Sequence, residues 1–289
     1  YDDNPIMNID NIFEDVLFAG CPLGRDIAGT EKHVIGFKRT DVLNYRDKYY
    51  QANNMHIVIA GRIPDNIQTL VHRYFGVGKQ NSHVSHVSHP SSFGSNKKDQ
   101  RIRVVKKETD QVQLMLGFPG LNYQDKRNQT LDLLVTILGG TMSSRLFIQI
   151  RERRGLAYHI RGGAENFCDT GYVYVRAGLE SKNVNKAIKV IQQELQKMVD
   201  TPVTKRELED AQMNIRGGLA LSLEDSSAQA NWYAQQALFF DKLYTPEERL
   251  KQIDQVTVKD IQRLSKHLFV LSKMRLAIIG NVDKERIVF

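Results

Sequence analysis

A helix, an apolar strand and a glycine recur in the same register at the two ends of this chain. Four identical residues lie 219 positions apart, namely Asp41 and Asp260, Met55 and Met274, Ile59 and Ile278, and Gly61 and Gly280. Self-similarity at a fixed offset is the signature of a duplicated structural unit. The repeat therefore predicts two copies of one domain, in which a helix leads into a buried strand that ends at a glycine.

The first copy is too short to be complete. If the second copy ends near Gly280, the stretch up to Arg62 cannot hold a first copy of comparable length. We therefore expect an α+β fold, a duplicated domain of antiparallel sheet covered by helices, with the first copy truncated. Residues 80–100 are rich in Ser, His, Gly and Lys, which is typical of a linker. We accordingly divide the chain at this linker into residues 1–79 and residues 101–289.

Hydrophobic periodicity and turn residues place the remaining elements. Helices are predicted at 9–19, 40–52, 65–75, 125–138, 143–154, 184–199 and 258–268, with further helix from 205 to 237. Strands are predicted at 55–60, 101–108, 111–117, 158–164, 171–179 and 274–279. Thr204 and Glu207 form the capping-box pattern that opens a helix.

Composition narrows the class of protein. Hydrophobic residues make up 41% of the 289 residues and charged residues 25%, as in soluble globular proteins. No apolar run approaches the ~18 residues of a membrane span. The two cysteines cannot form a disulfide framework, so a reducing compartment such as the cytoplasm is slightly favoured, although the sequence does not identify the compartment. The net charge is +7, but basic and acidic residues are interspersed, which argues against nucleic-acid binding.

Residues 139–160 carry the strongest signal for chemistry. An amphipathic helix is predicted to end at Gly155, with Arg151 on its last turn, and Tyr158 starts the strand that folds back across the glycine. The two side chains can therefore reach one point in space. The N–H groups of an arginine guanidinium and a phenolic hydroxyl can donate hydrogen bonds to a peptide carbonyl. They can also donate to the oxyanion formed when water attacks that carbonyl. On spacing alone, a solvated arginine and an ordinary strand tyrosine remain an open alternative.

Two stretches resemble a known family. The run Ser143-Ser144-Arg145-Leu146-Phe147, continued by Arg151-Glu152-Arg153-Arg154-Gly155-Leu156-Ala157-Tyr158, resembles the C-terminal half of pitrilysin-type (insulinase-like) zinc metallopeptidases, in the branch that includes mitochondrial processing peptidase. Pro22-Leu23-Gly24-Arg25 and the following residues to Thr30 are similar to a second family stretch, where Cys21 replaces a histidine-like residue. The similarity extends over nearly the whole chain.

The resemblance implies a portion of a zinc-dependent endopeptidase that cleaves extended peptides in a chamber between two homologous halves. Residues 1–79 would be the end of the first, zinc-binding-type domain, and residues 101–289 the second, substrate-contacting domain. Arg151 and Tyr158 would bind the substrate and stabilise its carbonyl during catalysis. The expected partners are an extended peptide and either the missing N-terminal zinc-binding segment or a homologous partner chain, in a homodimer or heterodimer.

No metal ligand is assigned to this chain. None of its eight histidines has the His-x-x-Glu-His or His-Glu-x-x-His spacing. His83, His86 and His89 lack acidic or thiol partners nearby, which argues against a metal site in the linker. We therefore expect zinc only in the complete enzyme, and no peptidase activity from this chain alone. The alternative function is a noncatalytic partner, or core-type subunit, of a peptidase-like assembly.

Overall fold

The computed structural model describes residues 3–76, 92–94 and 100–289, and its contacts divide the chain into two compact units. Unit 1 comprises residues 1–26, 91–216 and 247–289, and unit 2 comprises residues 27–90 and 217–246. Most of the predicted linker lies outside the described residues, including the three histidines at 83, 86 and 89. The predicted domain boundaries therefore stay a prediction.

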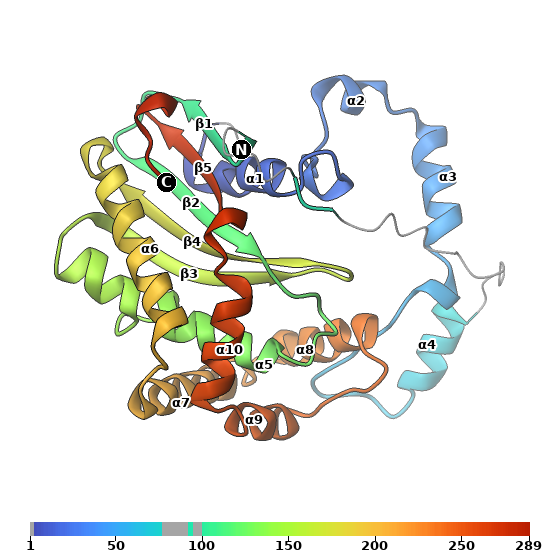
Figure 1. Ribbon diagram of the computed structural model, residues 1–289. Coiled ribbons are helices and arrows are strands. Elements are labelled where there is room, and N and C mark those ends of the chain that lie inside the picture. The colour runs from blue at the N-terminus through green and yellow to red at the C-terminus, as the bar shows by residue number, and fades with distance from the viewer. Residues whose placement is uncertain (1–2, 77–91, 95–99) are drawn as a thin grey trace. The chain divides into compact units, whose positions relative to one another are not determined.

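Unit 1 is built on a five-stranded sheet with the order β1-β5-β2-β4-β3 (Figure 1). Its strands are β1 (Ile102–Lys106), β2 (Val112–Pro119), β3 (Ala157–Asn166), β4 (Gly171–Leu179) and β5 (Arg275–Gly280). Three neighbouring pairs are antiparallel, whereas β1 and β5 are parallel. The predicted α+β class is confirmed, and the parallel pair is the one departure from the expected antiparallel sheet.

Helices cover both faces of this sheet. Helices α5 (Asn128–Val135), α6 (Val184–Asp200) and α10 (Val258–Leu268) enclose the larger core on one face. Helix α1 (Pro5–Leu17) covers the other face, where Ile9 and Phe13 belong to one buried cluster with Met115 and Ala277. Every residue of β5 is buried, and so are all but the last of β2, as expected of strands that have a helical layer on each side.

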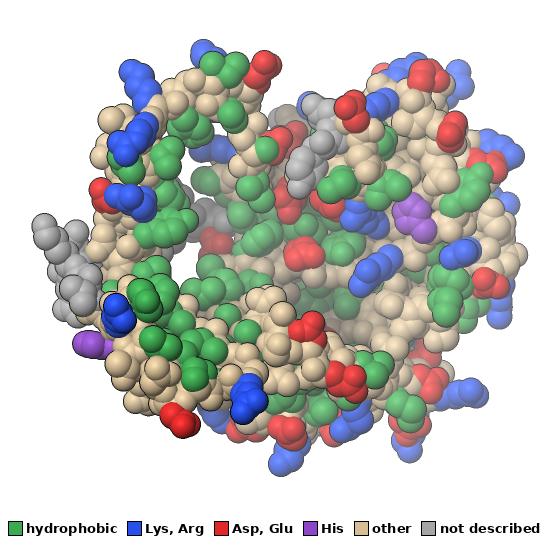
Figure 2. Space-filling model, turned by 180° about the vertical axis from the view of Figure 1, so that it is seen from behind, with side chains coloured by type: hydrophobic (Ala, Val, Ile, Leu, Met, Phe, Trp, Pro, Cys, Tyr) green, Lys and Arg blue, Asp and Glu red, His purple; other side chains and the backbone are tan. Residues whose placement is uncertain are grey.

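The remaining helices are α7 (Lys205–Ser222) and α9 (Pro246–Asp254), together with those within unit 2. Unit 2 contains α2 (Glu31–Gly36), α3 (Arg39–Tyr49), α4 (Ile67–Phe75) and α8 (Ser226–Phe239), and apolar side chains lie at its surface (Figure 2). Helices α2 and α9 were not expected from the sequence. Within the described ranges, no helix is both long enough and apolar enough to cross a membrane.

The strand predicted at 55–60 is wrong in this structure, because these residues carry no strand pairing. A strand is stabilised by hydrogen bonds to its neighbours, and unit 2 has no strand among its described residues. The equivalent stretch near the C-terminus does pair, as strand β5 between β1 and β2. The sequence pattern is the same in both places, so the difference arises from the surroundings.

Candidate functional site

Arg151 lies on a widened helical turn. Residues Phe147–Glu152 form a π-helix, in which the Arg153 amide donates to the Ile148 carbonyl at 2.9 Å. Such turns are rare and occur frequently at functional sites. The Arg151 side chain is exposed, and its guanidinium carbon lies 5.0 Å from the centre of the Phe147 ring. This cation–π contact restrains the guanidinium while its N–H groups stay accessible.

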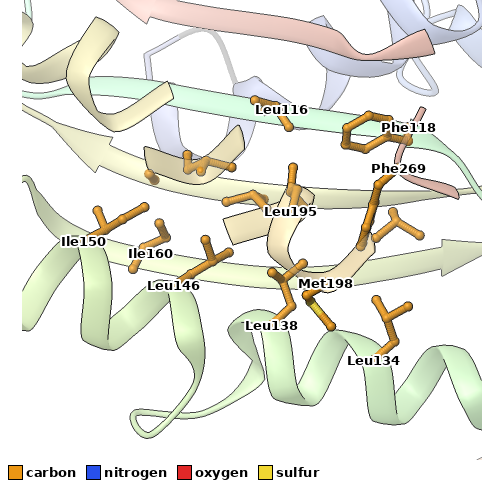
Figure 3. Close-up of a cluster of buried hydrophobic side chains, with 14 of the residues drawn as sticks. Leu116, Phe118, Leu134, Leu138, Leu146, Ile150, Ile160, Leu195, Met198 and Phe269 are labelled. Atoms are coloured by element: carbon orange, nitrogen blue, oxygen red, sulfur yellow. The ribbon is translucent and has the colours of Figure 1, made fainter. Parts of the chain in front are cut away.

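Buried leucine and isoleucine side chains fix this segment on the sheet. Leu146 and Ile150 are fully buried and point toward β3, where Ile160 meets them (Figure 3). A second π-helical segment, Thr136–Gly140, also approaches β3 closely. A Cβ atom at Gly139 would lie 2.3 Å from the backbone nitrogen of Gly162, so the contact requires glycine. This close packing fixes the helical layer, which carries Arg151, against strand β3, which carries Tyr158.

Gly155 makes the predicted reversal between helix and strand. Its φ is 57°, in the left-handed region that glycine adopts without steric cost. The Gly155 amide donates to the Arg151 carbonyl at 3.1 Å, and the Leu156 amide donates to the Ile150 carbonyl at 2.9 Å. The end of the helix at Gly155 is therefore confirmed.

Tyr158 occupies a β-bulge at the start of β3. Ala157 pairs with Leu179 and His159 pairs with Gly178, so Tyr158 is an extra residue without a partner on β4. Bulges turn a side chain away from the regular alternation of a strand and are over-represented next to active sites. The Tyr158 side chain is exposed, and its hydroxyl donates to Glu180 Oε1 at 3.3 Å.

The environment of Tyr158 favours the ionised form of Glu180 and the neutral form of His159. Lys182 Nζ lies 2.6 Å from Glu180 Oε2, and its hydrogen bond lowers the pKa of the Glu180 carboxyl. Partial burial lowers the pKa of His159, and the positive charges of Arg176 and Arg151 lower it further. Both effects favour the neutral imidazole. The Tyr158 hydroxyl therefore donates to a carboxylate that is itself paired with Lys182.

A bidentate ion pair joins the segment before Arg151 to helix α7. Arg145 donates to both carboxylate oxygens of Glu207, at 2.6 and 3.0 Å, and the Thr204 amide donates to Glu207 at 2.8 Å. Partial burial raises the pKa of Glu207, but the hydrogen bonds from Arg145 and Thr204 outweigh it and lower the pKa to about 2. The predicted capping box at Thr204 is confirmed and also anchors the candidate site.

Arg151 and Tyr158 lie on either side of the Gly155 turn, as the sequence predicted, and contact different neighbours. Arg151 lies over Phe147, whereas Tyr158 bonds to Glu180. Their roles in binding and catalysis stay a prediction. Sequence reasoning missed Glu180, because only strand pairing brings it beside Tyr158, 22 positions away. The spacing of Phe147 and Arg151, four residues apart on a helix, could have indicated their contact.

The described residues do not fit a zinc ion. Within residues 3–76, 92–94 and 100–289, no group of three His, Cys, Asp or Glu side chains is arranged to hold a metal. Catalytic zinc sites use three protein ligands of these types, so we derive no metal-dependent step from this part of the chain.

Comparisons with known sequences give a consistent result. Residues 36–215 match the family model described as the peptidase M16 inactive domain. The uncharacterized zinc protease YmxG of Bacillus subtilis is 29% identical over 269 residues, which cover 93% of this chain and 64% of the relative. The uncharacterized zinc protease ML0855 of Mycobacterium leprae is 30% identical over 286 residues, covering 96% of this chain and 62% of the relative. The chain thus spans less than two thirds of these relatives.

Solved structures share the fold at low sequence identity. A protease from Helicobacter pylori superposes with a TM-score of 0.85 at 19% identity, covering 96% of this chain and 67% of its own. A peptidase M16 inactive domain from Pseudomonas fluorescens gives 0.83 at 17% identity, with 98% and 67% covered. A chain of Complex III2 from Candida albicans gives 0.83 at 17% identity, with 99% and 70% covered. At these identities the similarity concerns the fold alone.

Proposed function

Because this chain belongs to the M16 peptidase family, whose inactive domain it matches, we propose that it is the substrate-contacting part of a zinc-dependent endopeptidase. The complete enzyme cleaves extended peptides in a chamber between two homologous halves. Relatives named zinc proteases support the reaction class. The observation that carries the role of this chain is the pair of backbone irregularities, the π-helix at Arg151 and the bulge at Tyr158, on either side of Gly155.

In this proposal, Arg151 and Tyr158 act on the peptide carbonyl. When water adds to that carbonyl, the oxygen gains negative charge, and preorganised donors lower the energy of this state more than that of the neutral substrate. The Arg151 guanidinium offers several N–H groups and a fixed positive charge. The Tyr158 hydroxyl exchanges its long hydrogen bond with Glu180 for one with the substrate. Both groups therefore contribute mainly to turnover.

In this proposal, the zinc ion is bound by another segment or chain and not by the described residues. The described residues offer no site for it, so the metal is held by a zinc-binding segment or by a homologous partner chain. Held there, the metal would supply the activated water for hydrolysis. This chain contributes binding and orientation, and by itself does not hydrolyse peptides.

Substitutions in the native polypeptide or complex that contains this chain test the proposal. We expect Arg151→Ala and Tyr158→Phe each to lower kcat about 10²–10³-fold, the typical loss for one oxyanion donor, without lowering the melting temperature. Arg153→Ala is the matched control, because Arg153 is exposed on the same segment and has no assigned role. Near-normal turnover in both variants would remove this role from the pair.

The fold shared with a chain of Complex III2 favours one alternative, a noncatalytic core-type subunit of a larger assembly. Chelator-sensitive cleavage of an unfolded peptide distinguishes the two functions. The native complex cleaves such a peptide if the chain belongs to an active peptidase. If it is a core-type subunit, the assembly remains intact and shows no cleavage before or after metal loading.

A further inference from the structure

One face of the β3–β4 hairpin carries basic side chains at one end and acidic side chains at the other. Alternate residues of a strand share a face. Four cross-strand pairs therefore lie in a row on this face, namely His159–Gly178, Arg161–Arg176, Gly163–Tyr174 and Glu165–Tyr172. Helix α1 lies on the same face, where the Tyr172 hydroxyl donates to Glu14 at 2.9 Å. The basic end of the row is thus the end beside Tyr158.

The basic end contains two arginines directly opposite each other. Arg161 of β3 pairs in register with Arg176 of β4, and opposite residues of an antiparallel pair have Cβ atoms ~5 Å apart. Both arginines act on one neighbour, because burial raises the pKa of the Tyr174 hydroxyl and both guanidinium charges oppose this rise. Like charges in directly opposite positions destabilise a sheet. The pair therefore costs stability unless an anion lies against both guanidinium groups.

Within the described part of the chain, one of these two arginines has a carboxylate partner. Arg176 Nη1 lies 3.1 Å from Asp10 Oδ2 on α1, and Arg176 also donates to the Ile6 carbonyl. Arg161 is exposed, and its side chain forms no hydrogen bond or ion pair with residues 3–76, 92–94 or 100–289. Asp10 shows that a carboxylate fits against this part of the face, while the N–H groups of Arg161 remain available for a ligand.

His159 connects the arginine pair to the candidate site. Its ring lies over the backbone of Gly178, where a Cβ atom would clash with it, so a glycine on β4 makes room for the imidazole. Partial burial lowers the pKa of His159, and the charges of Arg176 and Arg151 lower it further. A carboxylate bound beside the ring would have the opposite effect and favour the imidazolium. The basic surface formed by His159, Arg161 and Arg176 therefore continues from Arg151 along the hairpin.

The spacing along β3 fits an extended peptide. Arg161 comes three residues after Tyr158, and a strand advances ~3.3 Å per residue, so the two residues are about 7–10 Å apart across the bulge. An extended peptide advances by a similar amount per residue. A peptide that runs along β3 with one carbonyl at Tyr158 therefore brings a group two or three residues away to Arg161.

We propose that this basic surface binds a carboxylate of the peptide substrate, two or three residues from the carbonyl that the candidate site contacts. The inference rests on the proposed function, which brings the peptide to β3. Arginine binds carboxylates through two parallel N–H···O hydrogen bonds, and a carboxylate between Arg161 and Arg176 offsets their mutual repulsion. The carboxylate belongs either to an Asp or Glu side chain or to the C-terminus of the peptide.

Equilibrium binding of labelled peptides to the 289-residue chain tests this subsite. Three peptides share one neutral, extended sequence: one has an internal Glu and an amidated C-terminus, the second has Gln in place of Glu, and the third has Gln and a free C-terminal carboxylate. We expect a carboxylate peptide to bind at least ~10-fold more tightly than the neutral one, because hydrogen bonds between charged groups are the strong ones. The preference should shrink as the salt concentration rises.

The comparison between the two carboxylate peptides identifies the source of the carboxylate. Tighter binding of the Glu peptide assigns the subsite to a side chain within the substrate. Tighter binding of the free acid assigns it to the C-terminus of the substrate.

Two variants and a control make the test specific to Arg161. Arg161→Gln should abolish the preference without lowering the melting temperature, because the side chain is exposed. Arg161→Glu should reverse it in favour of a peptide with Lys in place of the internal Glu. Arg103→Gln is the matched control, since Arg103 is an exposed arginine on β1, the opposite edge strand of the same sheet, and this variant should keep the preference.

The outcomes separate this inference from the proposed function, because the binding assay requires no catalysis. The subsite is overturned if the three peptides bind equally, if none binds, or if the preference survives in Arg161→Gln. A preference that Arg161→Gln abolishes, found together with near-normal turnover in Arg151→Ala and Tyr158→Phe, counts only against the proposed function. Loss of turnover in those last two variants, with equal binding of the three peptides, counts only against the subsite.

Discussion

Tyr158 reaches solvent because the backbone of β3 carries one residue more than that of β4 at this point. Without the bulge, the alternation of the strand would assign its side chain to one face of the sheet. The π-helix at Arg151 similarly places one extra residue in a helical turn. Neither irregularity has a reliable signal in residue periodicity, so the sequence could predict the glycine turn between the two residues but not how each side chain is presented.

Replacing Gly155 by a residue with a side chain should lower the free energy of unfolding by a predictable amount. Its φ of 57° is unfavourable for a residue with a Cβ, while no atom lies within 4 Å of the position that a Cβ would occupy. Gly155→Ala should therefore lower the free energy of unfolding by about 1–2 kcal/mol through backbone strain alone. Urea denaturation followed by circular dichroism measures the change.

Gly217→Ala is the matched control for this prediction. Gly217 lies inside helix α7, its Cβ position is also open, and its φ is not positive. Replacing glycine by alanine within a helix should raise the free energy of unfolding by roughly 0.5–1 kcal/mol. If both substitutions change stability in the same direction, the strained turn at Gly155 is not responsible.

Among the elements, helix α10 and the segment 55–60 mark the limits of sequence reasoning. The predicted bounds of α10 agree with the structure because its capping box and apolar stripe are local signals. The segment 55–60 has an equally good strand pattern, but a strand also needs neighbours that no local pattern supplies. The packing of α1 on β2 and β5 was unpredictable for the same reason, since it joins residues about a hundred or more positions apart.

The contribution of the Arg145–Glu207 ion pair to the stability of the fold should depend on pH. The folded-state pKa of Glu207 is about 2, below its ordinary value of 4.5. A lowered folded-state pKa means that the ionised carboxylate stabilises the fold above pH 4.5, and that this contribution is lost as the pH falls toward 2. Urea denaturation at several pH values should show this loss in the native chain and not in Glu207→Gln.

The control for this titration is Glu209→Gln on the same helix. Glu209 forms a solvent-exposed ion pair with Lys205 at 3.2 Å, and exposed pairs of this kind contribute little. Its pH profile should therefore follow that of the native chain. A Glu207→Gln profile that also follows the native one would show that the Arg145 ion pair does not stabilise the fold.

For the molecule as a whole, the sheet of unit 1 depends on a helix from the beginning of the chain. Helix α1 supplies one of its two covering layers, and Phe13 is fully buried there, with its ring centre 5.4 Å from that of Tyr172. Phe13 also fills the space left by the missing side chain of Gly117, where a Cβ would lie 2.6 Å from its ring. Residues of α1 therefore complete one core layer of unit 1.

Phe13→Ala should accordingly lower the free energy of unfolding of unit 1 by about 3–5 kcal/mol, the usual cost of removing a buried phenylalanine ring. Met7→Ala on the same helix should change it by less than about 0.5 kcal/mol, because Met7 is 51% exposed. Hydrogen exchange of β2 and β5 amides gives the free energy for unit 1 separately. Equal effects of the two substitutions would mean that α1 does not stabilise the sheet, and that residues 101–289 fold without it.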